Sequence, residues 1–299
     1  MSSEPVPLFI NPVAGRGRAK REAASIRDLL GTCGVPVELI ESTAAGDLEE
    51  IIFRASAAGA DRIIVAGGDG SVHEAVNGLL RANNGTALGV IPLGTGNDFA
   101  KACSIPLNWK DAATLLANRL HDQAPIRYVD AGRMNDRFFA NGAGIGFDAK
   151  INRIAHNLQL PIGDLVYLVA VFQGMWDGVI TPKVKIIYDD CEYEGPVTLA
   201  SVSNGPWVGG MFHMAPMAKI DDGSLDLIYV SPVNRLRILA LLPKLIKGTH
   251  TGETEVTCSP IKSFRLVADE PVPSHLDGEV QPLQTDFQIE LLENSLRLL

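Results

Sequence analysis

The sequence predicts an α/β domain with a parallel sheet, followed by a domain rich in antiparallel β-strands. Up to about residue 124, short apolar strand patterns alternate with helical patterns, which is typical of βαβ units. Beyond that point short strand patterns dominate, and Val184, Ile186 and Tyr188 alternate with polar neighbours, as in a half-buried antiparallel strand. The strands of the first part also end in glycines and acids, at the edge where open α/β sheets bind ligands.

The first domain is predicted from four strands and the helical patterns that separate them. Its strands are short apolar runs, expected at 6–10, 35–40, 62–66 and 87–91. Asp47 is expected to cap a helix that reaches about residue 58, with Glu50 in the capping-box position. Asn108 is expected to cap a later helix that reaches about residue 116.

The second domain is predicted from strands and two helical insertions. Its clearest strands are expected at 127–133, 137–141, 183–189, 197–204 and 225–230. Helical patterns interrupt them at 162–176 and 232–247, and an apolar segment at 287–292 is expected to return as a strand to the first domain. The predicted domains are therefore 1–124 together with 287–299, and 125–286.

Composition narrows the classes of protein to consider. The 299 residues carry a net charge of −9, which argues against a general nucleic-acid binder, whose surface is basic. Four widely spaced cysteines without metal-ligand spacing indicate reduced thiols in a cytoplasmic protein. The N-terminus lacks a signal-peptide pattern, and the apolar segment 165–176 is shorter than the ~20 residues that a bilayer requires.

Two glycine-acid turns follow consecutive predicted strands, at 67–71 and 94–98. If these strands are neighbours in the sheet, Asp69 and Asp98 lie close together at one edge, with residues 11–15 beside them. Paired carboxylates require a divalent cation or hydroxyl groups to bind, whereas the amides at helix starts bind phosphate. The turns therefore predict a nucleotide-phosphate site; for the first turn alone, a purely structural strand-to-helix connection is the alternative.

Other nucleotide signatures are absent from the sequence. It contains neither the GxxxxGK[ST] loop nor the protein-kinase catalytic motifs. The glycines at 142–146 lack the spacing of a dinucleotide fingerprint and fall in the β-rich half, so they are interpreted as sites of close backbone packing.

Six motifs then occur in a fixed order along the chain. They are Asn-Pro-x-Ala-Gly (11–15), Gly-Gly-Asp-Gly-Ser (67–71), Pro-Leu-Gly-Thr-Gly-Asn-Asp (92–98), Asn-Gly-x-Gly-x-Gly-x-Asp (141–148), Asp-Asp-Gly-x-Leu-Asp (221–226) and Asp-Gly-Glu (277–279). With these motifs the chain resembles, over nearly its whole length, the diacylglycerol kinase catalytic-domain family, which includes soluble bacterial lipid kinases and sphingosine and ceramide kinases. The resemblance implies a Rossmann-like ATP-binding domain of the NAD-kinase/diacylglycerol-kinase type and a β-sandwich domain for the lipid, with the reaction in a cleft between them.

The resemblance also implies roles for individual residues in an ATP- and Mg²⁺-dependent phosphorylation of a lipid hydroxyl. Asp69, Asp98 and Asp130 would form an acidic network linked to Mg²⁺, and Glu279 would be the general base. Asp222 and main-chain oxygens of Lys219 and Ser224 would hold a structural Mg²⁺. The implied ATP contacts are Asn11, Pro12, Val13, Ala14, Gly15, Thr43, Gly68, Asp69, Gly70, Ser71, Val72, His73, Glu74 and Thr95. Ser71 stands where the family commonly has threonine, and the hydroxyl is retained.

The expected acceptor is diacylglycerol, converted to phosphatidic acid. A sphingoid base, phosphatidylglycerol or another lipid stays open as the acceptor, as does a non-catalytic nucleotide or lipid sensor on the same fold. The expected partner is lipid at a membrane surface rather than nucleic acid, and a homodimer stays open.

Two features of the sequence relate to lipid access. The segment 232–250 carries basic residues and an apolar face, which predicts either a helix on an anionic membrane surface or a helix that packs between domains. Its basic residues are Arg235, Arg237, Lys244 and Lys247. An apolar cluster is expected to line a lipid pocket or to form ordinary core: Trp207, Met211, Phe212, Met214 and Met217.

Overall fold

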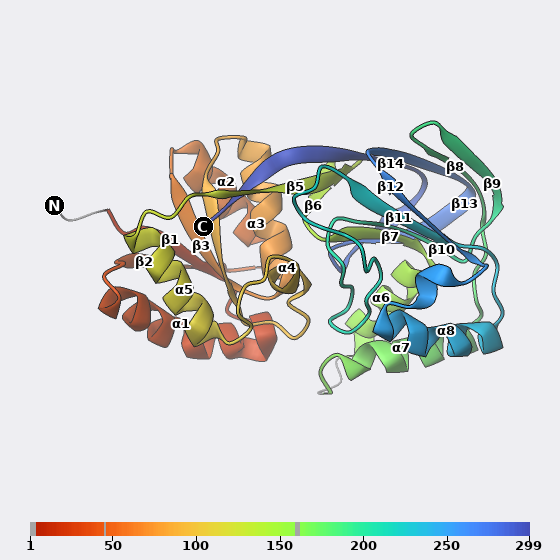
Figure 1. Ribbon diagram of the computed structural model, residues 1–299. Coiled ribbons are helices and arrows are strands. Elements are labelled where there is room, and N and C mark those ends of the chain that lie inside the picture. The colour runs from red at the N-terminus through yellow and green to blue at the C-terminus, as the bar shows by residue number, and fades with distance from the viewer. Residues whose placement is uncertain (1–3, 45, 159–161) are drawn as a thin grey trace. The chain divides into compact units, whose positions relative to one another are not determined.

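The computed structural model describes residues 4–44, 46–158 and 162–299 (Figure 1). The chain forms two compact units: unit 1 runs to Val129 and includes Asn294–Leu299, and unit 2 is Asp130–Glu293. These divisions differ from the predicted boundaries at 124 and 287. Residues 125–129 lie in unit 1, where Arg127 donates a hydrogen bond to the Cys103 carbonyl at 3.1 Å. Residues 287–293 lie in unit 2, because the side chains of Phe287 and Ile289 are buried in its core.

Unit 1 contains a parallel sheet with the strand order β4-β3-β1-β2. Its strands are β1 (Val6–Ile10), β2 (Val37–Glu41), β3 (Arg62–Gly67) and β4 (Ala87–Pro92). The end of β14 (Glu279–Leu298) adds a further parallel strand, since Arg297 and Leu298 pair with Ala87 and Leu88 of β4. All four predicted strands are confirmed, and the C-terminal segment returns to unit 1 by its last residues.

Helices cover both faces of this sheet (Figure 1). The helices α1 (Ala14–Thr32) and α5 (Trp109–His121) cover one face, and α2 (Asp47–Ala57) and α3 (Asp69–Ala82) cover the other. A short helix, α4 (Asp98–Ala102), follows β4. The helices α1 and α5 pack on alternate side chains of the central strands, such as Leu8, Ile64 and Ile91, because successive residues of a strand point to opposite faces.

The starts of two helices test the predicted caps. Asn108 caps α5 as expected, and its side-chain oxygen accepts from the Lys110 amide at 2.9 Å. Asp47 is the first residue of α2 rather than its cap, and Gly46 precedes it. The prediction for Asp47 was wrong because its carboxylate turns back to Thr43, accepting from the amide at 2.7 Å and from the hydroxyl at 2.9 Å.

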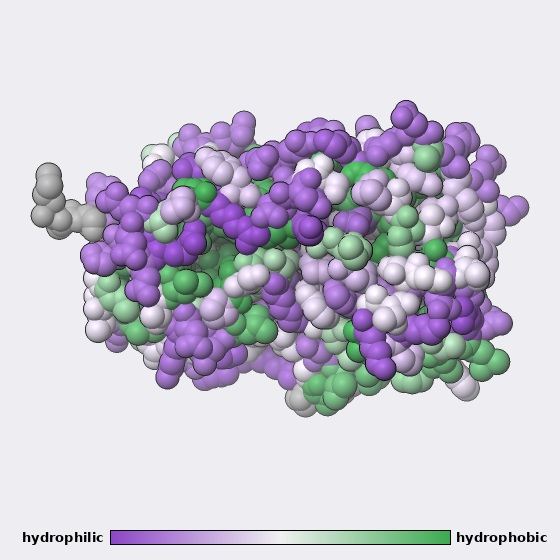
Figure 2. All heavy atoms as spheres, viewed as in Figure 1, coloured by the Kyte–Doolittle hydropathy of each residue, from purple (hydrophilic) through white to green (hydrophobic). Residues whose placement is uncertain are grey.

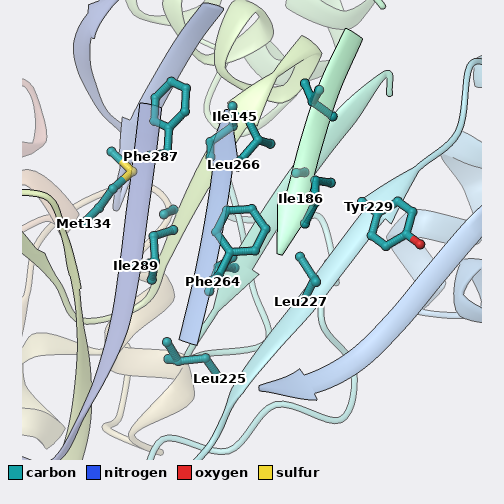
Figure 3. Close-up of a cluster of buried hydrophobic side chains, with 14 of the residues drawn as sticks. Met134, Ile145, Ile186, Leu225, Leu227, Tyr229, Phe264, Leu266, Phe287 and Ile289 are labelled. Atoms are coloured by element: carbon teal, nitrogen blue, oxygen red, sulfur yellow. The ribbon is translucent and has the colours of Figure 1, made fainter. Parts of the chain in front are cut away.

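Unit 2 is built from antiparallel strands in the order β12-β11-β10-β7-β13-β14. The long strand β13 (Ser263–Leu276) first pairs with β8 and then, past irregularities after Val267, with β7. Side chains from these strands meet in one core, which includes Ile145, Leu227, Phe264 and Leu266 (Figure 3). The remaining strands are β5 (Arg127–Met134), β6 (Arg137–Phe139), β7 (Gly142–Gly146), β8 (Lys183–Tyr188), β9 (Cys191–Pro196), β10 (Leu199–Ser203), β11 (Leu225–Val230) and β12 (Val256–Ile261).

Three helices of unit 2 pack together beside the sheet formed by β7, β10 and β11. They are α6 (Phe147–Leu158), α7 (Leu165–Trp176) and α8 (Arg235–Lys247), and a single 3₁₀ turn, His250–Gly252, follows α8. The two predicted helical insertions are confirmed as α7 and α8. The prediction missed α6, whose apolar residues Phe147, Ile151 and Ala155 recur at the helical period but start directly after a glycine-rich strand. None of the helices in the described ranges is both long and apolar enough to cross a membrane.

Candidate active site

Loops at the carboxyl ends of β1, β3 and β4 lie against one another at one edge of the unit 1 sheet. The strand β3 pairs with both β1 and β4, which confirms the expectation that these strands are neighbours. A Cβ atom on Gly15 would clash with the Leu93 carbonyl, and a Cβ atom on Gly94 would clash with the backbone of Gly68. Glycine is therefore required where the loops 11–17, 68–71 and 93–98 pack backbone to backbone.

The first of these loops has an unusual backbone. Gly15, Arg16 and Gly17 have φ values of 57°, 58° and 76°, so α1 becomes a regular helix only after them. The Asn11 side chain accepts from the Val13 amide at 3.1 Å, which tightens the turn after β1. Thr43 lies exposed after β2, next to β1, so the predicted nucleotide residues from Asn11 to Gly15 and Thr43 share this edge of the sheet.

Asp69 and Asp98 are the first residues of α3 and α4, and their charges interact. Asp69 Oδ1 accepts from the Phe99 amide at 3.3 Å, at the start of α4. Burial and, second, the negative charge of Asp98 raise the pKa of Asp69 to about 7. Lys101 Nζ lies 3.4 Å from Asp98 Oδ1 and offsets part of this charge. Two crowded carboxylates are hard oxygen ligands with excess negative charge, and they fit Mg²⁺.

The remaining predicted nucleotide residues fall into two groups. Gly68 and Gly70 lie at the start of α3, and Thr95 is exposed in the loop after β4. In contrast, Ser71, Val72 and His73 are buried as part of α3. The carboxylate of Glu74 accepts from the Glu49 amide at 3.3 Å, so this side chain ties α3 to α2.

In unit 2, Glu279 follows a two-residue hairpin turn. Leu276 pairs with Glu279 across β13 and β14, and the turn residues Asp277 and Gly278 have φ values of 49° and 89°. Both values are positive, as in the type I′ turn that favours Asp-Gly. The Asp277 carboxylate accepts from three successive amides, at residues 140, 141 and 142, at 3.0, 2.8 and 2.9 Å. This carboxylate therefore anchors the turn, whereas the Glu279 carboxylate has no hydrogen-bond partner among the described residues.

A buried histidine connects the same turn to α6. His275 Nδ1 lies 3.3 Å from the Gly278 amide, and Nε2 lies 3.1 Å from Asp148 Oδ2. The amide must donate to Nδ1, so the network assigns the ring proton to Nε2, which donates to Asp148. A Cβ atom on Gly144 would clash with both Asp148 and His275. The glycines at 142–146 thus serve close packing, as the sequence predicted.

Sequence reasoning gave no role to Asp277, His275 or Asp148. Asp277 could have been found from Asp-Gly, which is a strong hairpin signal. The pairing of His275 with Asp148 spans 127 positions, and no local pattern indicates it.

An apolar cavity lies between α6, α7, α8 and the strands β10 and β11. It encloses about 770 Å³ of empty space, its open mouth included. Asp148 is the acidic residue in its wall, with Thr198 and His250 as further polar residues. The apolar lining consists of Phe147, Ile151, Val171, Leu199, Phe212, Met214, Ile228, Val230, Val233, Ile238, Leu241, Leu242, Leu245 and Val256.

The predicted apolar cluster divides between this cavity and the surface. Phe212 and Met214 are buried and line the cavity. Met211 is partly buried against the core that α6 and α7 share. Met217 is exposed, and the Trp207 ring stacks on His213 with 4.2 Å between the ring centroids.

The loop predicted to hold a structural Mg²⁺ connects to Asp130. Asp130 Oδ2 accepts from the Gly223 amide at 2.8 Å, and Asp222 Oδ1 accepts from the Ser224 hydroxyl at 2.9 Å. Burial and, second, the charge of Asp222 raise the pKa of Asp226 to about 6. A carboxylate with main-chain oxygens in such a negative environment fits Mg²⁺. The described residues contain no cluster of three His, Cys, Asp or Glu side chains for a metal, so main-chain oxygens such as those of Lys219 and Ser224 would have to contribute.

Asp130 belongs to unit 2, whereas Asp69 and Asp98 belong to unit 1. The structure brings Asp69 close to Asp98, and the inclusion of Asp130 in their network stays a prediction.

Comparisons with known proteins identify the same family that the six motifs indicated. The family description "Diacylglycerol kinase catalytic domain" matches residues 5–158, and "YegS C-terminal NAD kinase beta sandwich-like domain" matches residues 142–299. The chain is 30% identical over 275 residues to a diacylglycerol kinase of Bacillus subtilis, covering 91% of this chain and 88% of that protein. It is 29% identical over 286 residues to a Xanthomonas oryzae protein named "Probable lipid kinase YegS-like", covering 92% and 91%.

The fold is also found in a solved structure. A crystal structure of a diacylglycerol kinase from Bacillus anthracis superposes with a TM-score of 0.74 at 27% identity, covering 100% of this chain and 97% of that one. This chain therefore shares with its relatives an N-terminal α/β domain with parallel strands and a C-terminal β-sandwich domain. The chain belongs to the family of the diacylglycerol kinase catalytic domain and is a lipid kinase, a phosphotransferase for which ATP is the implied phosphoryl donor.

Proposed function

We propose that this lipid kinase phosphorylates the free hydroxyl of diacylglycerol, with ATP and Mg²⁺, to give phosphatidic acid. The observation that carries the proposal is the apolar cavity of unit 2, whose wall includes Asp148. Asp148 is hydrogen-bonded to His275, which in turn accepts from the turn before Glu279. An apolar compartment is thus linked by two hydrogen bonds to the turn that precedes Glu279, the predicted general base.

The nucleotide is assigned to the loops at the edge of the unit 1 sheet. The amides at the start of α3, from Gly68 to Gly70, offer the positive end of a helix to phosphate oxygens. Arg16, exposed in the turn before α1, supplies positive charge at the same edge. Asn11, Gly15, Thr43 and Thr95 join this assignment as loop residues at the strand ends, whereas the buried Val72 and His73 are assigned to the packing of α3.

Asp69 and Asp98 are proposed to hold Mg²⁺. Bound there, the ion would offset the negative charge of the nucleotide and of the transferring phosphoryl group. The raised pKa of Asp69 supports this assignment, because burial and, second, the nearby charge of Asp98 disfavour its anionic form, and a cation would offset both. The loop with Asp222 is proposed as the separate structural Mg²⁺ site.

Glu279 is proposed as the general base. The lipid hydroxyl is a weak nucleophile, and its oxygen attacks the γ-phosphorus as its proton passes to the Glu279 carboxylate; the bond to ADP breaks. Positioned proton transfer of this kind contributes ~10²–10⁴-fold to a rate. The anchoring of the turn by Asp277 supports the role, because it fixes the backbone from which Glu279 projects. The proposal assigns Glu279 and the nucleotide loops to one reaction.

The cavity supports a neutral lipid as the acceptor. Its lining, within the described residues, contains no lysine or arginine to pair with the phosphate of phosphatidylglycerol. A sphingoid base is the second candidate, because the Asp148 carboxylate could pair with its ammonium group. Diacylglycerol is favoured because Asp148 already accepts a hydrogen bond from His275, so its carboxylate is less available to an ammonium group.

The test is phosphoryl transfer from labelled ATP to a panel of acceptors: diacylglycerol, sphingosine, phosphatidylglycerol and no lipid. We expect the highest kcat/KM with diacylglycerol, and a rate of lipid labelling that is ~10²–10⁴-fold lower with Glu279→Gln. A higher kcat/KM with sphingosine would move the assignment to the sphingoid base. ATP binding without turnover on any acceptor would instead establish a nucleotide or lipid sensor.

A further inference from the structure

The helix α7 presents its apolar side chains to solvent. Leu165, Val169, Phe172 and Trp176 follow each other at helical spacing, so they form one stripe along the helix. Phe172 is 55% exposed and Trp176 is 83% exposed. The helix carries no charged residue, and Figure 2 shows apolar atoms gathered where α7 lies in Figure 1. In a water-soluble helix the outward face would be polar, so this stripe requires another explanation.

A second apolar stripe lies on α8. Leu236, Leu239 and Ile246 are exposed, and Leu236 is 77% exposed. The two helices meet where Arg235, at the start of α8, donates to the Trp176 carbonyl at 3.3 Å. The stripes of α7 and α8 are therefore neighbouring parts of one surface, called here the α7/α8 face.

The charge on α8 differs from the basic face that the sequence predicted. Arg237 is held by Glu253 and Glu255, each at 2.5 Å, and Lys244 is paired with Glu253. These ion pairs connect α8 to the segment that follows it. Two of the four cations that the sequence predicted for an anionic membrane are therefore paired within the protein. Apart from these ion pairs, the positive charge of α8 lies at its two ends, at the exposed Arg235 and Lys247, and the helix contains no acidic residue.

We propose that the α7/α8 face docks this protein onto a lipid bilayer, mainly by inserting apolar side chains and only secondarily by electrostatic attraction. Trp176 and Phe172 are aromatic side chains suited to the interfacial region, and Arg235 and Lys247 would face lipid headgroups at the ends of α8. The inference rests on the proposed function for its choice of a lipid partner and adds how the enzyme reaches that lipid.

A bilayer fits this face better than a second protein does. The inner sides of the same two helices line the apolar cavity, through Val171 of α7 and Ile238, Leu241, Leu242 and Leu245 of α8. A bilayer against the outer side would place lipid chains beside the helices that enclose the cavity, whereas a protein partner would cover them. Positive charge at both ends of α8 complements lipid phosphates, but two copies packed face to face would bring like charges together.

The test compares the wild type with the triple variant Phe172→Ser, Trp176→Ser, Leu236→Ser, and with Leu283→Ser as a control. Leu283 is an exposed apolar residue on β14, with 53% exposure, away from this face. Sedimentation with phosphatidylcholine vesicles, with and without anionic lipid, measures binding. We expect the triple variant to bind at least ~tenfold more weakly than both other proteins, because partition follows buried apolar area. We also expect binding of the wild type to change little between 0.15 M and 1 M salt.

Two further measurements separate docking from catalysis and from folding. In the wild type the tryptophan fluorescence, to which Trp176 contributes, should shift to shorter wavelength on adding vesicles. Activity on a dispersed short-chain diacylglycerol should be equal in all three proteins, while activity on long-chain diacylglycerol in vesicles should fall in the triple variant. Absence of any lipid kinase activity would refute the proposed function and leave the vesicle result valid. Equal vesicle binding by the triple variant and the wild type would overturn the docking proposal, as would a wild-type dimer in sedimentation equilibrium that the triple variant abolishes.

Discussion

The turns Gly68-Asp69-Gly70 in unit 1 and Asp277-Gly278-Glu279 in unit 2 use the same residue types for opposite purposes. In unit 1 Asp69 also accepts from backbone amides of residues 97–99, but burial and, second, the charge of Asp98 raise its pKa to about 7. In unit 2 the first acid, Asp277, accepts from three backbone amides and anchors a hairpin. The second acid, Glu279, makes no such contact with its carboxylate among the described residues.

The difference shows what a carboxylate needs before it can do chemistry. A carboxylate whose oxygens accept several amides is stabilised as an anion and acts as a structural anchor. A carboxylate with few partners, or with a like charge beside it, retains capacity for a metal ion or a proton. This difference supports the proposed roles of Asp69 and Glu279 in the reaction and of Asp277 in the structure of the turn.

The largest expected effect separates Glu279 from Asp277. Glu279→Gln should lower kcat ~10²–10⁴-fold, because it removes the proton acceptor. Its unfolding midpoint should stay that of the wild type, since no hydrogen bond of the carboxylate is lost. Asp277→Asn should lose at least one acceptor for the amides and about 1–3 kcal/mol of stability. Kinetics and urea unfolding of both variants test this contrast, and equal stability loss in both would contradict it.

A second effect concerns the stability of unit 1 as a function of pH. The folded-state pKa of Asp69 is raised from 3.8 to about 7, so the folded state favours the neutral acid. The contribution of Asp69 to stability should therefore be fully present below pH ~4 and be lost as pH rises to ~7, by up to about 4 kcal/mol for the whole shift. Asp69→Asn keeps an oxygen that can accept from the Phe99 amide and removes this charge.

Urea unfolding in the presence of a chelator tests the pH dependence. Asp69→Asn should match the wild type at pH 4, exceed its stability at pH 8, and lose kinase activity. A variant that is no more stable than the wild type at pH 8 would show that the environment of Asp69 already compensates its charge.

The smallest expected effect concerns His275 as a positioning residue for the turn. His275→Asn places an amide oxygen near the site of Nδ1 and can still accept from Gly278, whereas His275→Gln can replace Nε2 toward Asp148 but not Nδ1. We expect kcat to fall roughly tenfold in His275→Gln, with KM for ATP unchanged, and to fall less in His275→Asn, because misplacement of a catalytic group is costly. Equal losses of kcat in both variants would assign His275 to packing alone.

Several features of the chain follow from short stretches of sequence. The alternation of apolar strands and helical patterns defines the parallel sheet of unit 1, because burial on both faces leaves a local apolar run for each strand. The glycine-acid turns at 67–71 and 94–98 follow those strands directly, so their place at one edge of the sheet is also a local property. The order of the six motifs was sufficient to indicate the family.

Tertiary structure decided what short stretches cannot encode. The role of Asp47 at the start of α2 depends on its hydrogen bonds to Thr43. The pairing of His275 with Asp148 joins residues that are 127 positions apart. Arg237 and Lys244 form ion pairs with Glu253 and Glu255. The sequence of α8 alone does not indicate these pairs, because both glutamates lie after the helix. The outward direction of the α7 stripe likewise depends on which face the rest of unit 2 covers.

The sequence alone thus determined the fold class, the family and the position of the acidic turns. It did so because hydrophobic periodicity and turn chemistry act over a few residues. Only the tertiary structure decided which carboxylates are satisfied, which cations are available and which apolar residues meet solvent. Those properties depend on burial and on partners that are distant in the chain.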